Sequence, residues 1–532
     1  MFESFADKLR EKNQGELPFK DQIKSLQELA FRLRENKKMG ADLLFMYTYM
    51  AAITTASITR PEIFAYTAER FEYVSSRYIA KVQRLVRGWN YSYAEGLRIV
   101  AEQVRNDTLK SMLNRYANST DAGIPDDAFI ETELSTVRNI YRNTFEQGVE
   151  LLKKWGDAYI AMLLSGTLVA IIIMISVAIY APDGIESALG ASYAIIIAIS
   201  GFGLGIMYKA VPDDPKTHGL ADICSREQGM VRRMERTVVP IAAMVCLVFA
   251  LLGVNAGIIF LLVGILIMPL GVIGYIDDQN IIKRDEDFST FIRGLGSVMG
   301  GKGITTGDAL KEVDKKSLVY LEPFINSVYS KLNLGLDEGL IWQRFIGECG
   351  SNLIYKYMNI FRDAVALGGS PDQIGKVVGS SMLEQVLLRS KRDMLVKGFV
   401  VLLVPMHGAM VGIFIFLFDI LLTMSQAVEA VMAQFSETTA ALSGSTSSIG
   451  GGMMSSMNFF VDFPEDIMTT YVVTILILLT IANTLAGKIV AGGDRYMYYF
   501  FAGLLCVITG VLYIVAPVMV GIFFNIPSFG AV

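Results

Sequence analysis

The sequence predicts an all-α polytopic membrane protein with about seven transmembrane helices and two homologous cytoplasmic helical-bundle domains. Three observations support this prediction. Hydrophobic residues make up 52% of the chain and gather in aliphatic stretches long enough to cross a bilayer. Short motifs recur in the same order in two distant parts of the chain. The basic residues avoid every segment that would face outward if the spans were threaded through a membrane.

The N-terminal segment, residues 1–45, is charged and amphipathic, and we expect it to be cytoplasmic. Its apolar residues are spaced for one face of a helix; they are Leu17, Ile23, Leu26, Leu29 and Leu33. A docking helix and a solvated extension both fit this pattern. No basic stretch leads into a short apolar run with a small-residue cleavage site, so we expect no cleaved signal peptide.

Two octets, "NYSYAEGL" and "NLGLDEGL", indicate an internal duplication. They share Asn90 with Asn333, Glu95 with Glu338 and Gly96 with Gly339. A glutamate followed by a glycine suits the first turn of a helix, where a carboxylate faces the positive helix end. The octets are therefore expected to be an architectural signature.

The flanks of the octets match as well. Upstream, "ASITRPEIF" resembles "KGITTGDAL"; downstream, "AGIPDDAF" resembles "GGSPDQIG" through Pro125 and Pro371, and "LLKKWGD" resembles "LLRSKRD". A period of roughly 240 residues is too long for a solenoid. With the 3.6-residue apolar spacing, this predicts two helical bundles, at residues 46–158 and 277–398.

Seven apolar stretches are candidate spans. They are Tyr159–Tyr180, Ser187–Tyr208, Val238–Leu252, Ala256–Ile276, Phe399–Leu422, Tyr471–Gly487 and Phe500–Phe524. The predicted order is a hairpin at 159–208, a basic loop at 209–237, a hairpin at 238–276, a fifth span at 399–424, and the last two spans at 471–524.

The basic residues predict the orientation. All 47 Lys and Arg residues lie in segments 1–158, 209–237, 277–398 and 488–499, which we therefore place in the cytoplasm. The loop 425–470 carries acidic residues and no basic one, so we place it and the C-terminal residues 525–532 outside the cell. The predicted location is the cell membrane.

One stretch nearly matches a nucleotide-binding loop. "GSVMGGKG" has the glycines and Lys302 of a P-loop, but Gly303 replaces the hydroxyl residue that binds Mg²⁺. The residues before it have helical and not strand spacing. We therefore expect no ATP hydrolysis here and interpret the glycines as a turn between helices.

Other candidate chemistry is sparse. His407 and Asp419 lie within the fifth predicted span, which by default suggests an intramembrane function. No second central charge accompanies them, so proton conduction is the weaker interpretation. The cysteines show no metal or disulfide spacing, and no catalytic or nucleic-acid-binding pattern is present. We expect a protein that is not an enzyme and has no cofactor.

Basic residues at the inner ends of the spans are candidate contacts with an acidic partner. Positive-inside anchoring is the simpler explanation for each of them. The candidates are Lys153, Lys154, Arg232, Arg233, Lys391 and Arg392.

Two stretches carry a family resemblance. "ADLLFMYTYMAAITTASITRPEIF" and "LLKKWGDAYIAMLLSG" are similar to archaellum platform proteins, the archaeal branch of the secretion-system F family. That family supplies the membrane platforms of type II secretion systems and type IV pili. Its bacterial members usually have about three spans, so seven spans fit the archaeal branch.

The resemblance implies a function. A platform couples a cytoplasmic hexameric ATPase to assembly, and in archaella to rotation, of a filament of pilin-like subunits. The implied partners are that ATPase, the filament subunits or filament base, the lipid membrane and a second copy of the chain. An adhesion-pilus or secretion platform is the alternative within the family, and a membrane transporter is the alternative outside it.

Overall fold

The computed structural model describes residues 38–180, 185–220, 223–441 and 464–523. These residues form helices joined by short loops, with one isolated β-bridge between Thr217 and Ser351. Seven of the helices are long and apolar enough to cross a membrane. The prediction of an all-α polytopic membrane protein is confirmed. Residues 1–37 of the predicted segment 1–45, residues 442–463 of the predicted loop 425–470, and the C-terminal residues 525–532 lie outside the described residues.

The helices of the first repeat follow helix 38–54. Their bounds are α3 Arg60–Ala68, α4 Ser76–Trp89, α5 Tyr93–Gln103, α6 Asp107–Asp121 and α7 Asp126–Tyr180. Helices α8 Ile185–Ala210 and α9 Arg226–Leu251 come next.

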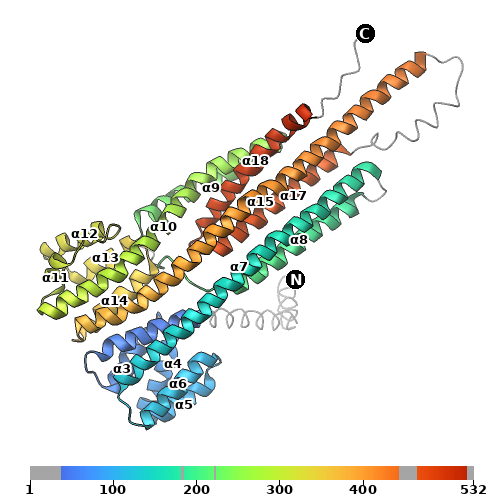
Figure 1. Cartoon of the computed structure of the whole chain (residues 1–532). Helices are drawn as coiled ribbons and strands as arrows, with labels where there is room; N and C mark the ends of the chain where they lie inside the picture. Colours follow the sequence, from blue (N-terminus) through green and yellow to red (C-terminus); the bar gives the residue numbers. More distant parts are fainter. Residues whose placement is uncertain (1–37, 181–184, 221–222, 442–463, 524–532) are drawn as a thin grey trace, which may run out of the picture. The chain divides into compact units, whose positions relative to one another are not determined.

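The second repeat has the same helix order. Its helices are the end of α10 Ala256–Lys302, then α11 Thr306–Glu312, α12 Glu322–Asn333, α13 Glu338–Cys349, α14 Asn352–Ala366 and α15 Pro371–Ala441. Helices α17 Glu465–Ala491 and α18 Met497–Phe523 complete the described chain. α7 and α15 are each one uninterrupted helix (Figure 1).

The repeat-signature residues lie at helix ends. Ser92 and Glu95 form a capping box at the start of α5, and Glu338 is the first residue of α13, after the N-cap Asp337. Asn90 ends α4 in the left-handed conformation, which asparagine tolerates better than most residues. In the second repeat Asn333 stays helical, and Gly335 takes the left-handed position instead.

The other signature residues also have packing or terminal positions. Gly96 is buried, and a Cβ added there would meet the Val82 side chain at 3.4 Å. Gly339 lies in the first turn of α13, Pro371 is the first residue of α15, and Pro125 directly precedes α7.

The chain divides into two compact units. Unit 1 contains the described residues up to Thr144, together with Phe288–Asp314 and Lys356–Glu384; unit 2 contains Phe145–Asp287, Lys315–Tyr355 and the described residues from Gln385. These units cut across the two sequence repeats. The boundaries 46–158 and 277–398 therefore remain a proposal that rests on the repeated motifs, whereas the two units are defined by how the helices pack.

Helix 38–54 forms much of the core of unit 1. Leu44, Met50 and Ile53 are fully buried. Asp42 accepts hydrogen bonds from the backbone and the hydroxyl of Ser75, and Thr48 donates to the Ser381 hydroxyl at 2.9 Å. A chain segment close to the N-terminus is thus tied to the start of α15.

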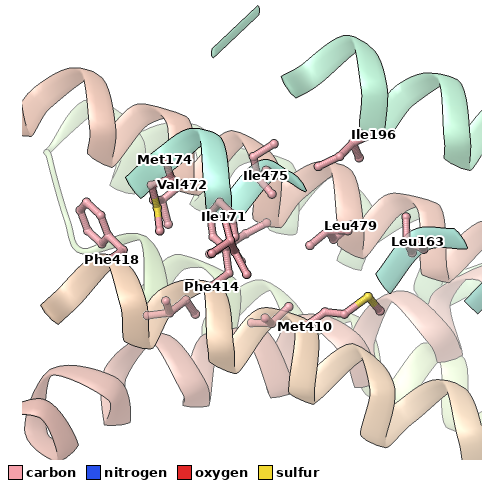
Figure 2. Packing of buried hydrophobic residues seen from close by; sticks show 14 of the residues in the cluster. Leu163, Ile171, Met174, Ile196, Met410, Phe414, Phe418, Val472, Ile475 and Leu479 are labelled. Carbon is pink, nitrogen blue, oxygen red and sulfur yellow. The ribbon is translucent and has the colours of Figure 1, made fainter. Parts of the chain in front are cut away.

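The core of unit 2 lies among four long helices. Figure 2 shows its apolar side chains interdigitating. They come from α7 (Leu163, Ile171 and Met174), α8 (Ile196), α15 (Met410, Phe414 and Phe418) and α17 (Val472, Ile475 and Leu479).

Candidate functional site

The predicted contact residues on α7 and α9 differ in exposure. Lys153 and Lys154 are exposed on α7. On α9, Arg233 is exposed and Arg232 is half-buried. These four positions remain candidates for contact with a partner.

The two predicted contact residues on α15, Lys391 and Arg392, lie in different environments. Lys391 is exposed and forms an ion pair with Glu146 of α7. Arg392 is only 3% exposed, and its guanidinium donates to the carbonyl oxygens of Val490 and Ile489. Its selection as a surface contact is therefore wrong, because the side chain is enclosed by the end of α17.

Arg392 belongs to a network of buried charges in unit 2. At its centre, Arg389 donates to Asp285 Oδ2 at 2.6 Å and to Asp214 Oδ1 at 2.6 Å. Asp285 also accepts from the Ser351 hydroxyl. Burial acts to raise the pKa of Asp214, but the charge and hydrogen bonds of Arg389, together with the charges of Arg392 and Lys216, outweigh it and the pKa is lowered.

Further pairs extend the network along α10. Lys216 Nζ lies 2.6 Å from Asp278 Oδ2, and both side chains are buried. Asp277 accepts from the Ser225 hydroxyl at 2.8 Å and from the Gln228 amide at 3.0 Å.

Arg284 connects α10 with the end of α13. It donates to the Cys349 carbonyl at 3.0 Å and lies 3.3 Å from a carboxylate oxygen of Glu227. A buried charge is tolerated only when it is paired and hydrogen-bonded, and Arg284 meets both conditions.

His218 attaches the loop between α8 and α9 to the same region. Its Nε2 lies 3.0 Å from the Gly347 carbonyl, and its Nδ1 accepts from the Leu220 backbone at 3.3 Å. These partners specify the neutral ring protonated on Nε2. Burial lowers the pKa of His218, which also favours the neutral form.

The network is suited to holding segments together. It joins the loop after α8, the start of α9, α10, the α13–α14 junction, α15 and the end of α17. Among the described residues, no cluster of His, Cys, Asp and Glu has a metal-binding arrangement. We interpret the charges as mechanical ties between these segments.

The sequence contains a signal for this network that the prediction missed. "PDDPK" follows the second span, and "IDDQNIIKRDED" follows the fourth. The basic residues of these stretches indicate the orientation, but the mixed charges carry a second signal. Their density directly beside apolar helices indicates buried pairing, although not which residues pair.

The P-loop-like stretch is helical. Gly296, Gly300 and Lys302 lie within α10, so only Gly303, with φ of +64°, forms the predicted turn. A Cβ at Gly300 would lie 3.0 Å from the Asp372 nitrogen of α15. The glycines thus allow close helix packing, and their helical backbone cannot form a phosphate-binding loop.

His407 belongs to a buried polar cluster among the apolar helices. It lies 3.0 Å from the Thr509 hydroxyl and 2.9 Å from the Asn483 amide, and the Tyr159 hydroxyl lies 3.2 Å from that amide's oxygen. The cluster connects α7, α15, α17 and α18. Asp419 is also buried, and one carboxylate oxygen has no hydrogen-bond partner among the described residues.

The first segments of α7 and α15 in unit 1 are in contact. Arg138 donates to the Ser381 hydroxyl at 2.7 Å, and Arg142 Nη2 lies 2.6 Å from Glu384. The contacting residues are 243 and 242 positions apart in the sequence. Because this separation stays nearly constant along the helices, α7 and α15 run in the same direction.

In unit 2, the contacting residues of α7 and α15 are also about 243 positions apart in the sequence. Glu146 pairs with Lys391, 245 residues later, and Thr167 contacts Met410, 243 residues later. The two similar stretches "LLKKWGD" and "LLRSKRD" begin 236 residues apart, so they do not lie directly opposite each other. Both helices are continuous, so residues 151–157 lie beside later residues of α15 than 387–393.

Comparison with known proteins identifies two relatives. Flagella accessory protein J of Methanococcus voltae is 21% identical over 346 residues, which are 62% of this chain and 61% of the relative. Flagella accessory protein J of Methanocaldococcus jannaschii is 20% identical over 398 residues, which are 71% of this chain and 69% of the relative. The match thus spans less than two thirds of the first relative. No family model and no solved structure matches the chain.

Proposed function

The chain is a relative of flagella accessory protein J, and we propose from this premise that it is a membrane platform of the archaellum. In this role it couples a cytoplasmic hexameric ATPase to assembly and rotation of a filament of pilin-like subunits. The bundles receive the force, and the membrane helices pass it to the filament base. The protein itself contributes no chemistry.

The continuity of α7 and α15 is the observation that best supports coupling. They contain 55 and 71 residues, or about 80 and 105 Å of helix at 1.5 Å per residue. Each runs from helical-bundle residues into an apolar span without a described break. An uninterrupted helix transmits a displacement along its axis with little loss.

The buried charge network supports the same function. Arg389 and Arg392 lie on α15 beside the start of its apolar stretch, and their partners lie on the loop after α8, on α10 and at the end of α17. A movement of α15 would therefore also pull on the loop after α8, on α10 and on the end of α17. Breaking such a buried pair costs about 3–5 kcal/mol, so these ties resist separation.

Two other functions are less well supported. An adhesion-pilus or secretion platform would use the same architecture, but both relatives are named as flagella accessory proteins. A transporter is expected to have discontinuous helices at its binding site. The seven described span helices are each continuous.

Gene deletion and co-purification test the proposal. Deletion should abolish archaella and swimming, and a plasmid copy should restore both. The full-length protein in detergent should retain the ATPase encoded in the same gene cluster. Intact archaella in the deletion strain would contradict the platform function, and loss of adhesion pili alone would support the alternative platform.

Variants that test partner binding should leave Arg392 unchanged, because its side chain is buried. Reversing Lys391 and Arg392 together would confound partner binding with unfolding, because only Lys391 is exposed. Lys153→Glu with Lys154→Glu is the cleaner test of basic residues near the membrane. It should weaken ATPase binding most at low salt if these side chains contact the partner, and leave it unchanged if they only anchor the helix.

A further inference from the structure

Helix α4 carries an exposed basic face in unit 1. Arg77, Lys81, Arg84 and Arg87 follow the spacing i, i+4, i+7 and i+10, which places them on one side of a helix. All four are exposed. The opposite side contains the buried residues Ile79 and Val82.

None of the four basic side chains forms an ion pair with a described residue. Elsewhere in unit 1 basic residues are commonly paired, as Arg60 is with Asp126 and Arg70 is with Asp363. Four like charges along one exposed helix face repel one another. The face therefore gains from an acidic partner, which the described residues do not supply.

Large aromatic side chains are exposed near both ends of α4. Phe71, which precedes α4, is 83% exposed, and Trp89 at the end of α4 is 74% exposed. Tyr91 is exposed as well. Arginine and tryptophan are enriched among the residues that dominate protein–protein binding energy.

The second repeat provides an internal comparison. In the register set by Asn90 and Asn333, the four basic positions correspond to Tyr320, Phe324, Ser327 and Ser330. The buried position Val82 corresponds to Ile325, which is also buried. The repeat therefore retains an apolar core position without the basic face, so the helix fold does not require these charges.

From these observations we propose that the α4 basic face, defined as Arg77, Lys81, Arg84 and Arg87 with the flanking Phe71 and Trp89, is a docking surface for an acidic protein surface. This inference rests on the proposed function, and it assigns the partner surface to the cytoplasmic ATPase. It also predicts an asymmetry, because the equivalent face of α12 lacks the basic residues.

A protein partner fits the α4 basic face better than a membrane surface does. An amphipathic helix that binds a bilayer inserts its apolar face into the lipid. The apolar face of α4 is already buried in unit 1 through Ile79 and Val82. Phe71 lies five residues before α4 and Trp89 is its last residue, so the two do not form a continuous apolar stripe.

Binding by the full-length protein in nanodiscs of neutral lipid tests this proposal. The binding partner is the purified ATPase from the same gene cluster, titrated at low and at moderate salt. The test variant is Lys81→Glu with Arg84→Glu. The control is Arg105→Glu with Lys110→Glu, which changes the net charge equally at exposed positions that also have no ion pair with described residues.

We expect the test variant to bind at least about tenfold more weakly at low salt and to show less dependence on salt. The control should bind as the unaltered protein does. Trp89→Ala should lose affinity at both salt concentrations, because its contribution is apolar. Thermal melting should show that all three variants remain folded, since every altered side chain is exposed.

Each other result has a defined meaning. If the unaltered protein binds the ATPase and the test variant binds within about twofold of the control, the α4 proposal is wrong and the proposed function stands. The titration is repeated in nanodiscs that contain anionic lipid; if the unaltered protein binds only there and the test variant binds as well as the control, the face is not the ATPase contact and the proposal is overturned. If no binding occurs in either lipid, the proposed coupling to the ATPase fails as well.

Discussion

Arg389 and Asp285 form an ion pair of 2.6 Å in which the two side chains are 2% and 1% exposed. The same guanidinium also holds Asp214, which belongs to the loop after α8. Such a pair is costly to create but more costly to break, because the remaining partner keeps a buried and uncompensated charge. Arg389 is thus the residue on which the network most depends.

Arg389→Ala should lower the stability of unit 2 strongly. It leaves two carboxylates without their cation, and breaking a buried pair typically costs about 3–5 kcal/mol. Arg344→Ala is the matched control, because Arg344 pairs with Glu348 on the surface and such pairs contribute at most about 1 kcal/mol. Thermal unfolding of the purified protein should separate the two variants clearly. Equal melting temperatures would show that the network contributes little.

His218 should make stability depend on pH. Its pKa is lowered, chiefly by burial and also by nearby Arg232, so the folded protein holds the neutral ring. Below the ordinary value of 6.5, the unfolded chain binds a proton that the folded chain does not. Stability from this residue is therefore complete above that pH and is lost as the pH falls below it.

Melting temperatures measured between pH 8 and pH 5 test the His218 prediction. In His218→Gln the decrease toward pH 5 should be smaller than in the unaltered protein. Comparison at pH 8 isolates the effect of the substitution itself, since the imidazole is neutral there in both states. Parallel curves for the two proteins would contradict the prediction.

The sequence was sufficient for the membrane helices because their signal is local. A span needs only length and apolarity, and each of the seven predicted spans falls on a different candidate span helix of the structure, with its ends inside that helix or one residue beyond it. The helix order in the two repeats could also be anticipated, since the matching motifs mark helix ends. Both features depend on residues that are close together in the chain.

The buried network could not be predicted because its pairs are remote in sequence. Arg389 and Asp285 are 104 residues apart, and Arg389 and Asp214 are 175 residues apart. A single sequence does not reveal which charges meet across such distances. The error at Arg392 has the same cause, since its partners Ile489 and Val490 belong to the next span helix, α17, almost 100 residues later.

Lys302→Ala should leave any measured ATP hydrolysis unchanged. Lys302 ends α10 and forms an exposed ion pair with Glu312. A phosphate-binding loop needs free backbone N–H groups, whereas those of a helix interior are already used. The measurement is phosphate release by purified protein, with vanishing activity expected in both forms. Robust hydrolysis that is abolished by the substitution would disprove this interpretation of the glycine-rich stretch.

Cysteine labelling should place residues 425–470 outside the cell. The distribution of all 47 basic residues predicts this orientation. A cysteine at Ser445 or Ser455, both outside the described residues, should react with a membrane-impermeant thiol reagent on intact cells. A cysteine at Ser111, which is exposed on α6, should react only after lysis. Labelling of the Ser111 variant in sealed cells would reverse the topology.

Glycines seven residues apart bring α10 and α18 into close contact. They are Gly257, Gly264 and Gly271 on α10, and Gly503 and Gly510 on α18. A Cβ added at Gly264 would lie 2.8 Å from the Val507 backbone nitrogen, and one at Gly510 would lie 2.5 Å from the Leu261 nitrogen. Small residues permit such approach, and in lipid this packing is a main source of helix association.

Gly271→Ala should therefore destabilise the membrane helices, although alanine is the better helix former by about 1 kcal/mol. The added methyl would overlap backbone atoms of Phe500, which can move only if α18 moves. Overpacking of this kind costs about 1–3 kcal/mol. Gly201→Ala on α8 is the matched control, because a Cβ there meets no atom within 4 Å. Thermal unfolding in detergent should lower the melting temperature of the Gly271 variant and leave that of the Gly201 variant unchanged or raised. If both variants are as stable as the unaltered protein, α10 and α18 do not pack on their glycine faces as described.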